Sequence, residues 1–209
     1  MASIEAVIFD YGCVISTRQV KEEVAKMEEL AGANPEELWK TYWRYRSEYD
    51  CGLPGKEYWG KVLSFCRVSV DEALIEQLIT HDIRSWTVLN RRMLVLIEKI
   101  KNSGLKLGLI SNMPPDVLNY MKKNFTWLQN RLFNTMIFSC EIRLCKPNPA
   151  VFVKCIRDLG LTPEECLFVD DSKVNIQGAR DVGLKTIHYT TYNKFLEEIA
   201  VVFNSSYVV

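Results

Sequence analysis

The sequence predicts an α/β protein with a doubly wound parallel sheet, interrupted after its first strand by an all-helical insertion. Three observations support this fold class. An apolar run at the N-terminus ends in a single carboxylate, Asp10. From residue 90 onward, short apolar strands alternate with segments of helical periodicity, which is typical of a parallel sheet covered on both faces. Residues 16–86 show helical spacing only.

The first strand is the apolar run Val7, Ile8 and Phe9, which has the composition of a fully buried strand. Asp10 would then lie at the carboxyl end of that strand, which is where open α/β sheets bind ligands. A carboxylate in this place can act as a nucleophile, as a metal ligand, or as both. Gly12 follows two residues later, at a position where a second carboxylate could have stood.

The insertion comprises about four helices. The first is expected over residues 17–31 and is closed by Gly32, and the second begins with the cap residues Asn34 and Pro35 and continues to about Tyr49. A turn over residues 50–55 precedes two more helices, over 56–66 and 71–81. We therefore expect residues 1–15 and 87–209 to form one domain and residues 16–86 to form a helical domain.

The remainder of the chain supplies the other strands and their crossover helices. Right-handed crossovers would give a doubly wound sheet. Strands are expected over 105–110, 135–138, 166–169 and 185–189, and helices over 90–103, from Pro114 or Pro115 to 124, and over 149–159, 173–182 and 194–203. The tail 204–209 is expected to be loose.

Composition excludes several functional classes. The chain has 209 residues with 26 basic and 26 acidic side chains, so no overall field attracts nucleic acid or an anionic membrane. Without a signal segment or an apolar stretch of about 20 residues, a cytoplasmic protein is expected. Its seven cysteines lack a Cys-x-x-Cys pair and are expected to be reduced thiols. Nothing in the sequence specifies an oligomeric state.

Polar side chains follow four of the predicted strands, and in a parallel sheet these strand ends share one edge. They are Asp10, Ser111 with Asn112, Lys146, and the pair Asp170 and Asp171. Adjacent carboxylates suit Mg²⁺, lysine suits a phosphoryl oxygen as a point charge, and a hydroxyl before a helix N-terminus suits an anion. This combination is what phosphoryl transfer through an aspartyl intermediate requires.

These four segments resemble, in order, the four motifs of the haloacid dehalogenase superfamily of hydrolases. The segments are Phe-Asp-Tyr-Gly-Cys-Val-Ile, Leu-Ile-Ser-Asn, Cys-Lys-Pro-Asn-Pro and Phe-Val-Asp-Asp-Ser-Lys-Val-Asn-Ile-Gln-Gly-Ala. Their order and spacing fit the family from residue 4 to about residue 190. The resemblance implies a Rossmann-like core, and it implies that the insertion is a mobile α-helical cap that selects the substrate.

The resemblance also assigns roles to individual residues. Asp10 would attack phosphorus, and Lys146 would offset the negative charge shared by Asp10 and the phosphate. Ser111 and the Asn112 region would bind phosphoryl oxygens, while Asn175 would fix the loop of the fourth motif. Mg²⁺ would be held by Asp10, the Gly12 carbonyl and Asp170, with Asp171 supporting its water shell.

Gly12 departs from the family pattern. Typical phosphatases of the family have a second aspartate there, which protonates the leaving group and then activates water, a form of help worth about 10²–10⁴-fold. The favoured hypothesis is a Mg²⁺-dependent phosphatase of a small phosphorylated metabolite that uses another acid, water, or an easy leaving group such as a sugar 1-phosphate. The alternatives are a 2-haloacid dehalogenase, since those enzymes also lack the second aspartate, and a catalytically weak protein that only binds a partner.

The insertion offers fewer clues to the substrate. Trp39, Tyr42, Trp43 and Arg46 follow helical spacing, and such a stripe is more often core than ligand site. Arg46 and Tyr49 are nevertheless our expected substrate contacts, because caps of the family present a selectivity loop near the break that follows them. Cys13 is expected to pack near the nucleophile rather than to act as a catalytic thiol.

Overall fold

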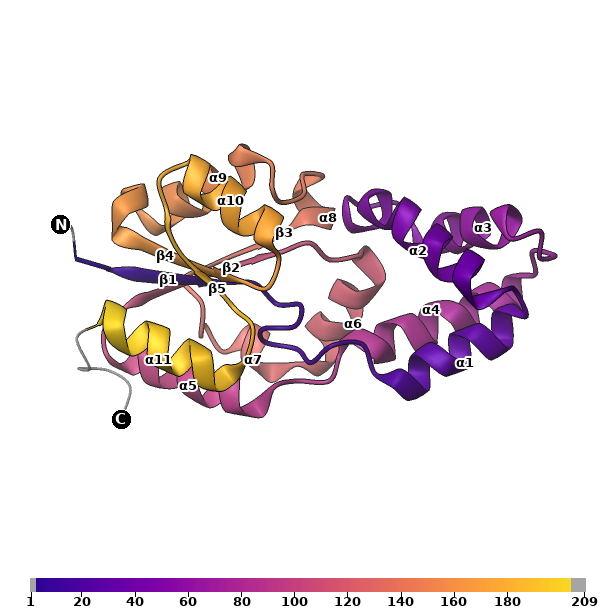
Figure 1. The fold of residues 1–209 in the computed structure, drawn as a ribbon, viewed down its shortest axis with the longest axis horizontal. Coiled ribbons are helices and arrows are strands. Elements are labelled where there is room, and N and C mark those ends of the chain that lie inside the picture. The colour runs from indigo at the N-terminus through magenta and orange to yellow at the C-terminus, as the bar shows by residue number, and fades with distance from the viewer. Residues whose placement is uncertain (1–2, 204–209) are drawn as a thin grey trace.

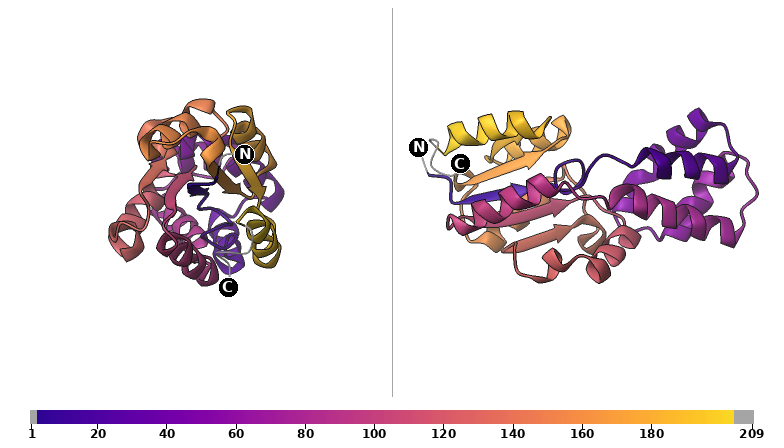
Figure 2. Two further views of the ribbon diagram at one scale, coloured as in Figure 1. Left: turned by 90° about the vertical axis from the view of Figure 1, so that its left-hand side faces the viewer. Right: turned by 90° about the horizontal axis from the view of Figure 1, so that it is seen from below.

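The computed structural model describes residues 3–203 and has two lobes, which Figures 1 and 2 show from three sides. One lobe is built on a parallel sheet, and the other consists of four helices. The predicted loose tail lies outside the described residues. The strands of the sheet are β1 (Ala6–Phe9), β2 (Lys106–Ser111), β3 (Thr135–Phe138), β4 (Cys166–Asp170) and β5 (Lys185–His188).

The strand order, β3-β2-β1-β4-β5, confirms the predicted Rossmann-like, doubly wound fold. The chain first winds outward from β1 to β3 and then returns to the other side of β1. This reversal makes β1 and β4 neighbours, with Phe9 paired to Val169. The backbone N–H of Asp10 donates to the carbonyl of Val169 at 2.9 Å. The first and fourth motifs therefore meet at the switch point of the sheet.

Helices cover both faces of the sheet (Figure 1). Successive side chains of β1 alternate between the faces: Val7 and Phe9 join one core cluster, and Ala6 and Ile8 join the other. The helices of this lobe are α5 (Arg91–Asn102), α6 (Pro115–Asn124), α7 (Thr126–Gln129), α8 (Ser139–Ile142), α9 (Pro149–Leu159), α10 (Lys173–Asp181) and α11 (Tyr192–Val202), with a 3-10 turn at Pro163–Glu165. The short helices α7 and α8 and the 3-10 turn were not predicted, because three or four residues show no periodicity.

The second lobe is the inserted helical domain, which we call the cap, and it has its own hydrophobic core, which includes Trp59 and Tyr58. Its helices are α1 (Lys21–Ala31), α2 (Pro35–Asp50), α3 (Gly55–Phe65) and α4 (Glu72–Trp86). Two predicted ends are wrong. Helix α1 begins four residues later than expected, because the backbone of Val20 donates to Ser85 instead. Helix α4 continues five residues beyond His81, since its last turns bury polar side chains such as Asp82 and Ser85 that break the apolar pattern.

The two segments that join cap and core run antiparallel beside each other. Ser16 and Leu89 form a β-bridge, and the N–H of Thr17 donates to the Val88 carbonyl at 2.8 Å. Both crossings between the two lobes therefore lie at one place.

On the other side of the molecule, the turn after α2 is fastened to the core. Cys51 forms a disulfide with Cys145, with 6.1 Å between their Cα atoms. The prediction that all cysteines are reduced is wrong for this pair, because sequence spacing does not reveal that the cap turn folds against the segment before Lys146. Gly52 packs against the Cys140 carbonyl so closely that an added Cβ would lie 3.0 Å from it. The turn thus lies directly against the core, and we refer to this arrangement as the closed form.

Candidate active site

Lys146 lies at the centre of the site. Its Nζ atom is 2.7 Å from Oδ1 of Asp10 and 2.7 Å from Oδ2 of Asp170, and it donates to the Ile110 carbonyl at 2.9 Å. The lysine side chain is 1% exposed, so this contact is shielded from solvent. Three strand ends that are far apart in the sequence therefore contribute to one buried charge cluster, as the sequence predicted.

The charges in this cluster depend on one another. Burial opposes the positive charge of Lys146, but attraction by Asp10 and Asp170 outweighs it and raises the pKa of the lysine. Burial raises the pKa of Asp10 to about 7, with Lys146 lowering it and Asp170 raising it further. One cation thus serves two buried carboxylates, which leaves the cluster suited to a further positive charge.

Asn112 orients the lysine through its backbone. The Asn112 amide donates from Nδ2 to the Lys146 carbonyl at 3.0 Å, and the Lys146 N–H donates to Asn112 Oδ1 at 2.8 Å. Packing fixes the other side of the same loop: a Cβ on Gly178 of α10 would lie 2.7 Å from Pro147. The Asn112 side chain thus positions Lys146, and Asn112 also lines the cavity described below; a contact of the Asn112 region with phosphate stays a prediction.

Asp170 is held by the start of α10. Its Oδ1 accepts from the Ser172 N–H at 2.7 Å, and the Asn175 amide donates to both of its oxygens, at 3.1 and 3.0 Å. With Lys146 on Oδ2, each oxygen of this fully buried carboxylate has at least two donors. Asn175 therefore holds the Asp170 carboxylate in place, whereas the role expected of it was to fix the loop of this motif.

The three carboxylates of the first and fourth motifs form a candidate metal centre. One oxygen from each of Asp10, Asp170 and Asp171 lies within 4.8 Å of the others. An all-oxygen set with one exposed member fits Mg²⁺, which prefers oxygen ligands and keeps several waters. Burial, and then the charge of Asp170, raises the pKa of Asp171, so the cluster would gain from a divalent cation. Gly12 lies beside these carboxylates on the wall of the cavity.

A cavity of about 160 Å³ lies between cap and core above this cluster. Its wall joins the carboxylates and lysine of the core to aromatic and charged residues of the cap. The lining residues are Asp10, Tyr11, Gly12, Cys13, Trp43, Arg46, Asp50, Trp86, Asn112, Met113, Pro114, Val117, Lys146, Asp171 and Asn175. Burial raises the pKa of the Cys13 thiol to about 12, which leaves it a poor nucleophile, as expected.

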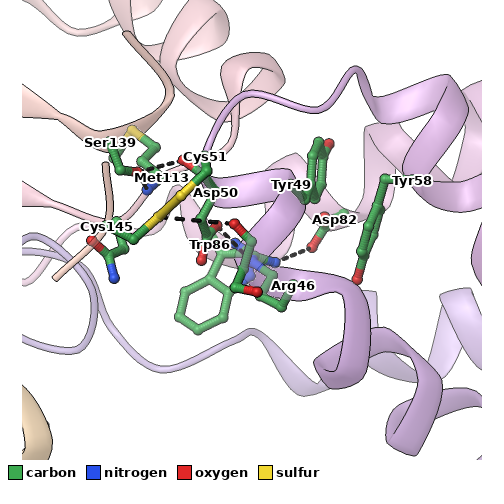
Figure 3. A network of polar contacts seen from close by, with 12 residues as sticks. Arg46, Tyr49, Asp50, Cys51, Tyr58, Asp82, Trp86, Met113, Ser139 and Cys145 are labelled. Atoms are coloured by element: carbon green, nitrogen blue, oxygen red, sulfur yellow. Dashed lines mark hydrogen bonds and ion pairs between the residues drawn. A yellow bond between two sulfur atoms is a disulfide. The ribbon is translucent and has the colours of Figure 1, made fainter. Parts of the chain in front are cut away.

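Of the two cap residues expected to contact the substrate, the structure places Arg46 on the cavity wall and Tyr49 away from it. Arg46 lines the cavity, but its Nε donates to Asp50 at 2.8 Å and its Nη1 is 3.6 Å from Asp82 (Figure 3). Tyr49 is fully buried outside the cavity wall, and its hydroxyl donates to Asp116 of α6 at 3.0 Å. Tyr49 therefore joins cap to core and is not brought to the cavity.

Ser111 is the last residue of β2 and is 1% exposed. Its hydroxyl makes only a 3.5 Å contact, to the Asn112 carbonyl. It is absent from the cavity wall in this closed form, although it neighbours residues that line it. A role in binding a phosphoryl oxygen stays a prediction.

Sequence reasoning missed three cap residues of the cavity wall. Trp43 belongs to the stripe interpreted as cap core, yet it is 52% exposed. Trp86 lay beyond the expected end of its helix, and Asp50 was assigned to the turn after α2. A helical wheel that included Asp50 would have placed it one turn after Arg46, and their i, i+4 spacing is the signal that was available.

Comparison with curated proteins finds phosphatases among the relatives. The chain is 31% identical over 99 residues, 47% of its length, to phosphoglycolate phosphatase of Salmonella paratyphi A, of which the match covers 38%. It is 24% identical over 199 residues, 90% of its length, to a sesquiterpene phosphatase of Aspergillus oryzae, of which the match covers 91%. The chain spans only 8 to 38% of the length of several curated relatives it matches.

Solved structures share the whole architecture. A HAD family enzyme from Bacteroides thetaiotaomicron, in complex with magnesium and inorganic phosphate, superimposes with a TM-score of 0.73 at 20% identity, covering 92% of this chain and 99% of that one. The L-2-haloacid dehalogenase of Xanthobacter autotrophicus gives 0.66 at 19% identity, covering 99% and 84%. At these identities the likeness establishes the fold alone.

The sequence model of the haloacid dehalogenase-like hydrolases matches residues 51–189, about two thirds of the chain. This range contains three of the four predicted motifs, and the remaining one, the first motif around Asp10, follows the central strand β1, which pairs with β2 and β4. The chain belongs to the haloacid dehalogenase-like hydrolase family.

Proposed function

We propose that this hydrolase is a Mg²⁺-dependent phosphatase that forms an aspartyl-phosphate intermediate on Asp10. The observation that carries the proposal is the buried lysine that bridges Asp10 and Asp170 beside a three-carboxylate cluster. A phosphoryl group brings additional negative charge to Asp10, and Lys146 and a divalent cation are the groups that would neutralise it.

The proposed reaction has two steps at phosphorus. An Asp10 oxygen attacks phosphorus, the bond from phosphorus to the leaving oxygen breaks, and that oxygen takes a proton. Water then attacks the phosphorus of the intermediate, which releases phosphate and regenerates Asp10. Lys146 stays charged throughout, because the two carboxylates raise its pKa. Asp10, Asp170 and Asp171 would hold Mg²⁺, which supplies charge neutralisation at the transferred phosphoryl oxygens.

The size and walls of the cavity support a small phosphorylated metabolite as the substrate. A volume of about 160 Å³ in the closed form holds only a small group besides phosphate. Trp43 and Trp86 supply flat apolar surfaces, and Arg46 and Asp50 supply polar contacts. The phosphatase names of two relatives agree with a phosphate ester as the substrate, and phosphoglycolate, named for one of them, is a small metabolite.

Phosphate release from a panel of sugar phosphates and nucleotides, with and without Mg²⁺, tests the proposal. We expect activity that requires Mg²⁺ and disappears in Asp10→Asn. Asp158→Asn is a matched control, because that partly exposed carboxylate of α9 forms its ion pairs with Lys154 and Arg157 at the surface and is absent from the cavity wall, so the rate should be unchanged. Metal-dependent release that persists in Asp10→Asn would contradict the proposed nucleophile.

A 2-haloacid dehalogenase is the second candidate, favoured by Gly12, which leaves no side-chain acid beside the nucleophile. The carboxylate cluster of Asp10, Asp170 and Asp171 argues against it, since metal-free displacement of halide has no use for three converging acids. Halide release from 2-haloacids without metal would support this candidate over the phosphatase.

No described helix has the length and apolarity needed to cross a membrane. A cytoplasmic location stays a prediction, and the Cys51–Cys145 disulfide weighs against it, because strongly reducing compartments keep thiols reduced.

A further inference from the structure

Helix α2 ends with a carboxylate on the wall of the catalytic cavity. Asp50 is 9% exposed and lines the same cavity as Asp10 and Lys146. Figure 3 shows its side chain between Arg46 and the turn that carries Cys51. In a chain with Gly12 in place of the family's second aspartate, it is a carboxyl group available from the cap.

The position of Asp50 is fixed from both sides of the cleft between cap and core. The Ser139 hydroxyl, at the start of α8, donates to the Asp50 carbonyl, and the same Ser139 oxygen accepts from the Met113 N–H at 2.9 Å. The next residue, Cys51, is bonded to Cys145, which directly precedes Lys146. In the closed form the carboxyl group is therefore held in register with the catalytic loops.

The charges around Asp50 favour its holding a proton. Arg46 is the one cation shared by Asp50, at 2.8 Å, and Asp82, at 3.6 Å, and both carboxyl groups are buried. Two ionised carboxylates beside one guanidinium would leave an uncompensated negative charge in a desolvated place. One proton retained by the pair removes that charge.

Of the two carboxyl groups, Asp50 is the one that faces the cavity, so the proton of the pair can reach a bound substrate through it. The Asp82 side chain is fully buried and accepts from the Tyr42 hydroxyl at 2.7 Å, whereas the Asp50 side chain is 13% exposed and its Oδ1 is the atom bound by Arg46. Burial raises the pKa of both carboxyl groups, against the lowering effect of Arg46 on each and of Lys146 on Asp50. The other titratable neighbours of Asp50 are Asp82, Tyr58 and Cys140.

We propose that Asp50 is the general acid and base of the reaction, supplied by the cap in place of the aspartate missing at Gly12. This inference rests on the proposed phosphatase function. In the first step the Asp50 carboxyl gives its proton to the leaving oxygen as that oxygen departs from phosphorus. In the second step the Asp50 carboxylate takes a proton from the water that attacks the intermediate, which returns it to its starting state.

Substrates with different leaving groups distinguish an acid role of Asp50 from a merely structural role. The p-nitrophenolate ion leaves without a proton, whereas an alkoxide requires one. We therefore compare the first-turnover release of leaving group from p-nitrophenyl phosphate and from an alkyl phosphate, because the first turnover excludes the water step. Asp50→Asn is expected to slow the alkyl substrate by about 10²–10⁴-fold and the aryl substrate by less than about tenfold.

Two further variants sharpen the test. Asp82→Asn removes the other carboxylate on Arg46, so Asp50 should lose its proton at a lower pH and the alkyl substrate should be slowed more than the aryl substrate. Gly12→Asp in the Asp50→Asn background should restore the alkyl rate, because an added Cβ at Gly12 has only Asp10 Oδ2 within 4 Å, at 3.9 Å. Equal losses on both substrates in Asp50→Asn, or a lack of rescue by Gly12→Asp, would overturn the proposal.

The unmodified protein provides a measurement that does not depend on how the variants fold. With Asp50 as acid, its first-turnover rate should vary little between aryl and alkyl leaving groups, and a rate that falls steeply with leaving-group basicity would refute the role. A protein that hydrolyses neither substrate with Mg²⁺ present would instead refute the proposed phosphatase function itself.

Discussion

Replacement of Lys146 by methionine tests the central charge cluster most severely. Methionine keeps the length and apolar stem of the lysine but removes its charge. At an effective dielectric of about 20, each 2.7 Å contact to Asp10 or Asp170 corresponds to about 6 kcal/mol of Coulomb attraction. Desolvation of three buried ions offsets most of this, and breaking such a buried pair typically costs about 3–5 kcal/mol. We expect Lys146→Met to lose that much unfolding free energy at pH 8 in the absence of metal.

The loss should depend on pH in a defined direction. Because Lys146 lowers the pKa of Asp10, the carboxyl group of the variant keeps its proton to a higher pH than in the natural protein, where the pKa is about 7. Above pH 7 the folded variant therefore binds more protons than the folded natural protein, and the destabilisation grows by as much as about 1.4 kcal/mol per pH unit. Below pH 6 both forms hold the proton, and the loss is smallest.

Urea unfolding at pH 5.5 and pH 8 measures the effect. Lys154→Met is the matched control: its ion pair with Asp158 is at the surface, with side chains 38% and 28% exposed, and should contribute only about 0.3–0.5 kcal/mol. A Lys146→Met variant that loses no more stability than Lys154→Met, or whose loss is independent of pH, would refute the described cluster.

Two other predictions concern the metal and the disulfide. The raised pKa of Asp10 means that folding takes up a proton between about pH 4 and pH 7, so stability without metal falls as pH rises through that window, while Mg²⁺ binds better to the ionised form. At a concentration a hundred times its Kd, Mg²⁺ should add about 2.7 kcal/mol, or roughly 5–10 °C in Tm, with a clearly larger gain at pH 7.5 than at pH 5; an equal gain at both pH values would contradict the site. Alkylation of the denatured, unreduced protein should label five of the seven cysteines, and reduction should lower stability by about 2–5 kcal/mol; seven labelled thiols would show that Cys51 and Cys145 are not bonded.

Much of the core and its charged residues could be predicted because both follow from strand ends. The apolar runs that end in Asp10 and Asp170 mark two strands, and parallel strands bring such ends to one edge. Lys146 could be predicted because it lies in the third motif, in the segment that follows β3 and precedes α9. These features depend on local sequence and on a general rule of topology.

The contribution of the cap could not be predicted in the same way. Asp50, Trp43 and Trp86 reach the cavity only because the closed cap places α2 and α4 over the sheet edge, and that docking depends on contacts such as Tyr49 with Asp116. Tyr49 and Asp116 lie on different lobes, so the sequence pattern of neither helix indicates that they are in contact. The disulfide of Cys51 was missed for the same reason, because its partner lies 94 residues away on the other lobe.

Detection of a phosphoryl group on Asp10 during turnover is the most direct test of the proposed mechanism. Enzyme mixed with Mg²⁺ and p-nitrophenyl phosphate, quenched in acid within the first turnover and digested, should yield a phosphorylated peptide containing Asp10. The same quench of Asp10→Asn should yield none. Phosphate release with no phosphorylated Asp10 at any quench time, or with the label on another residue, would contradict the proposed mechanism.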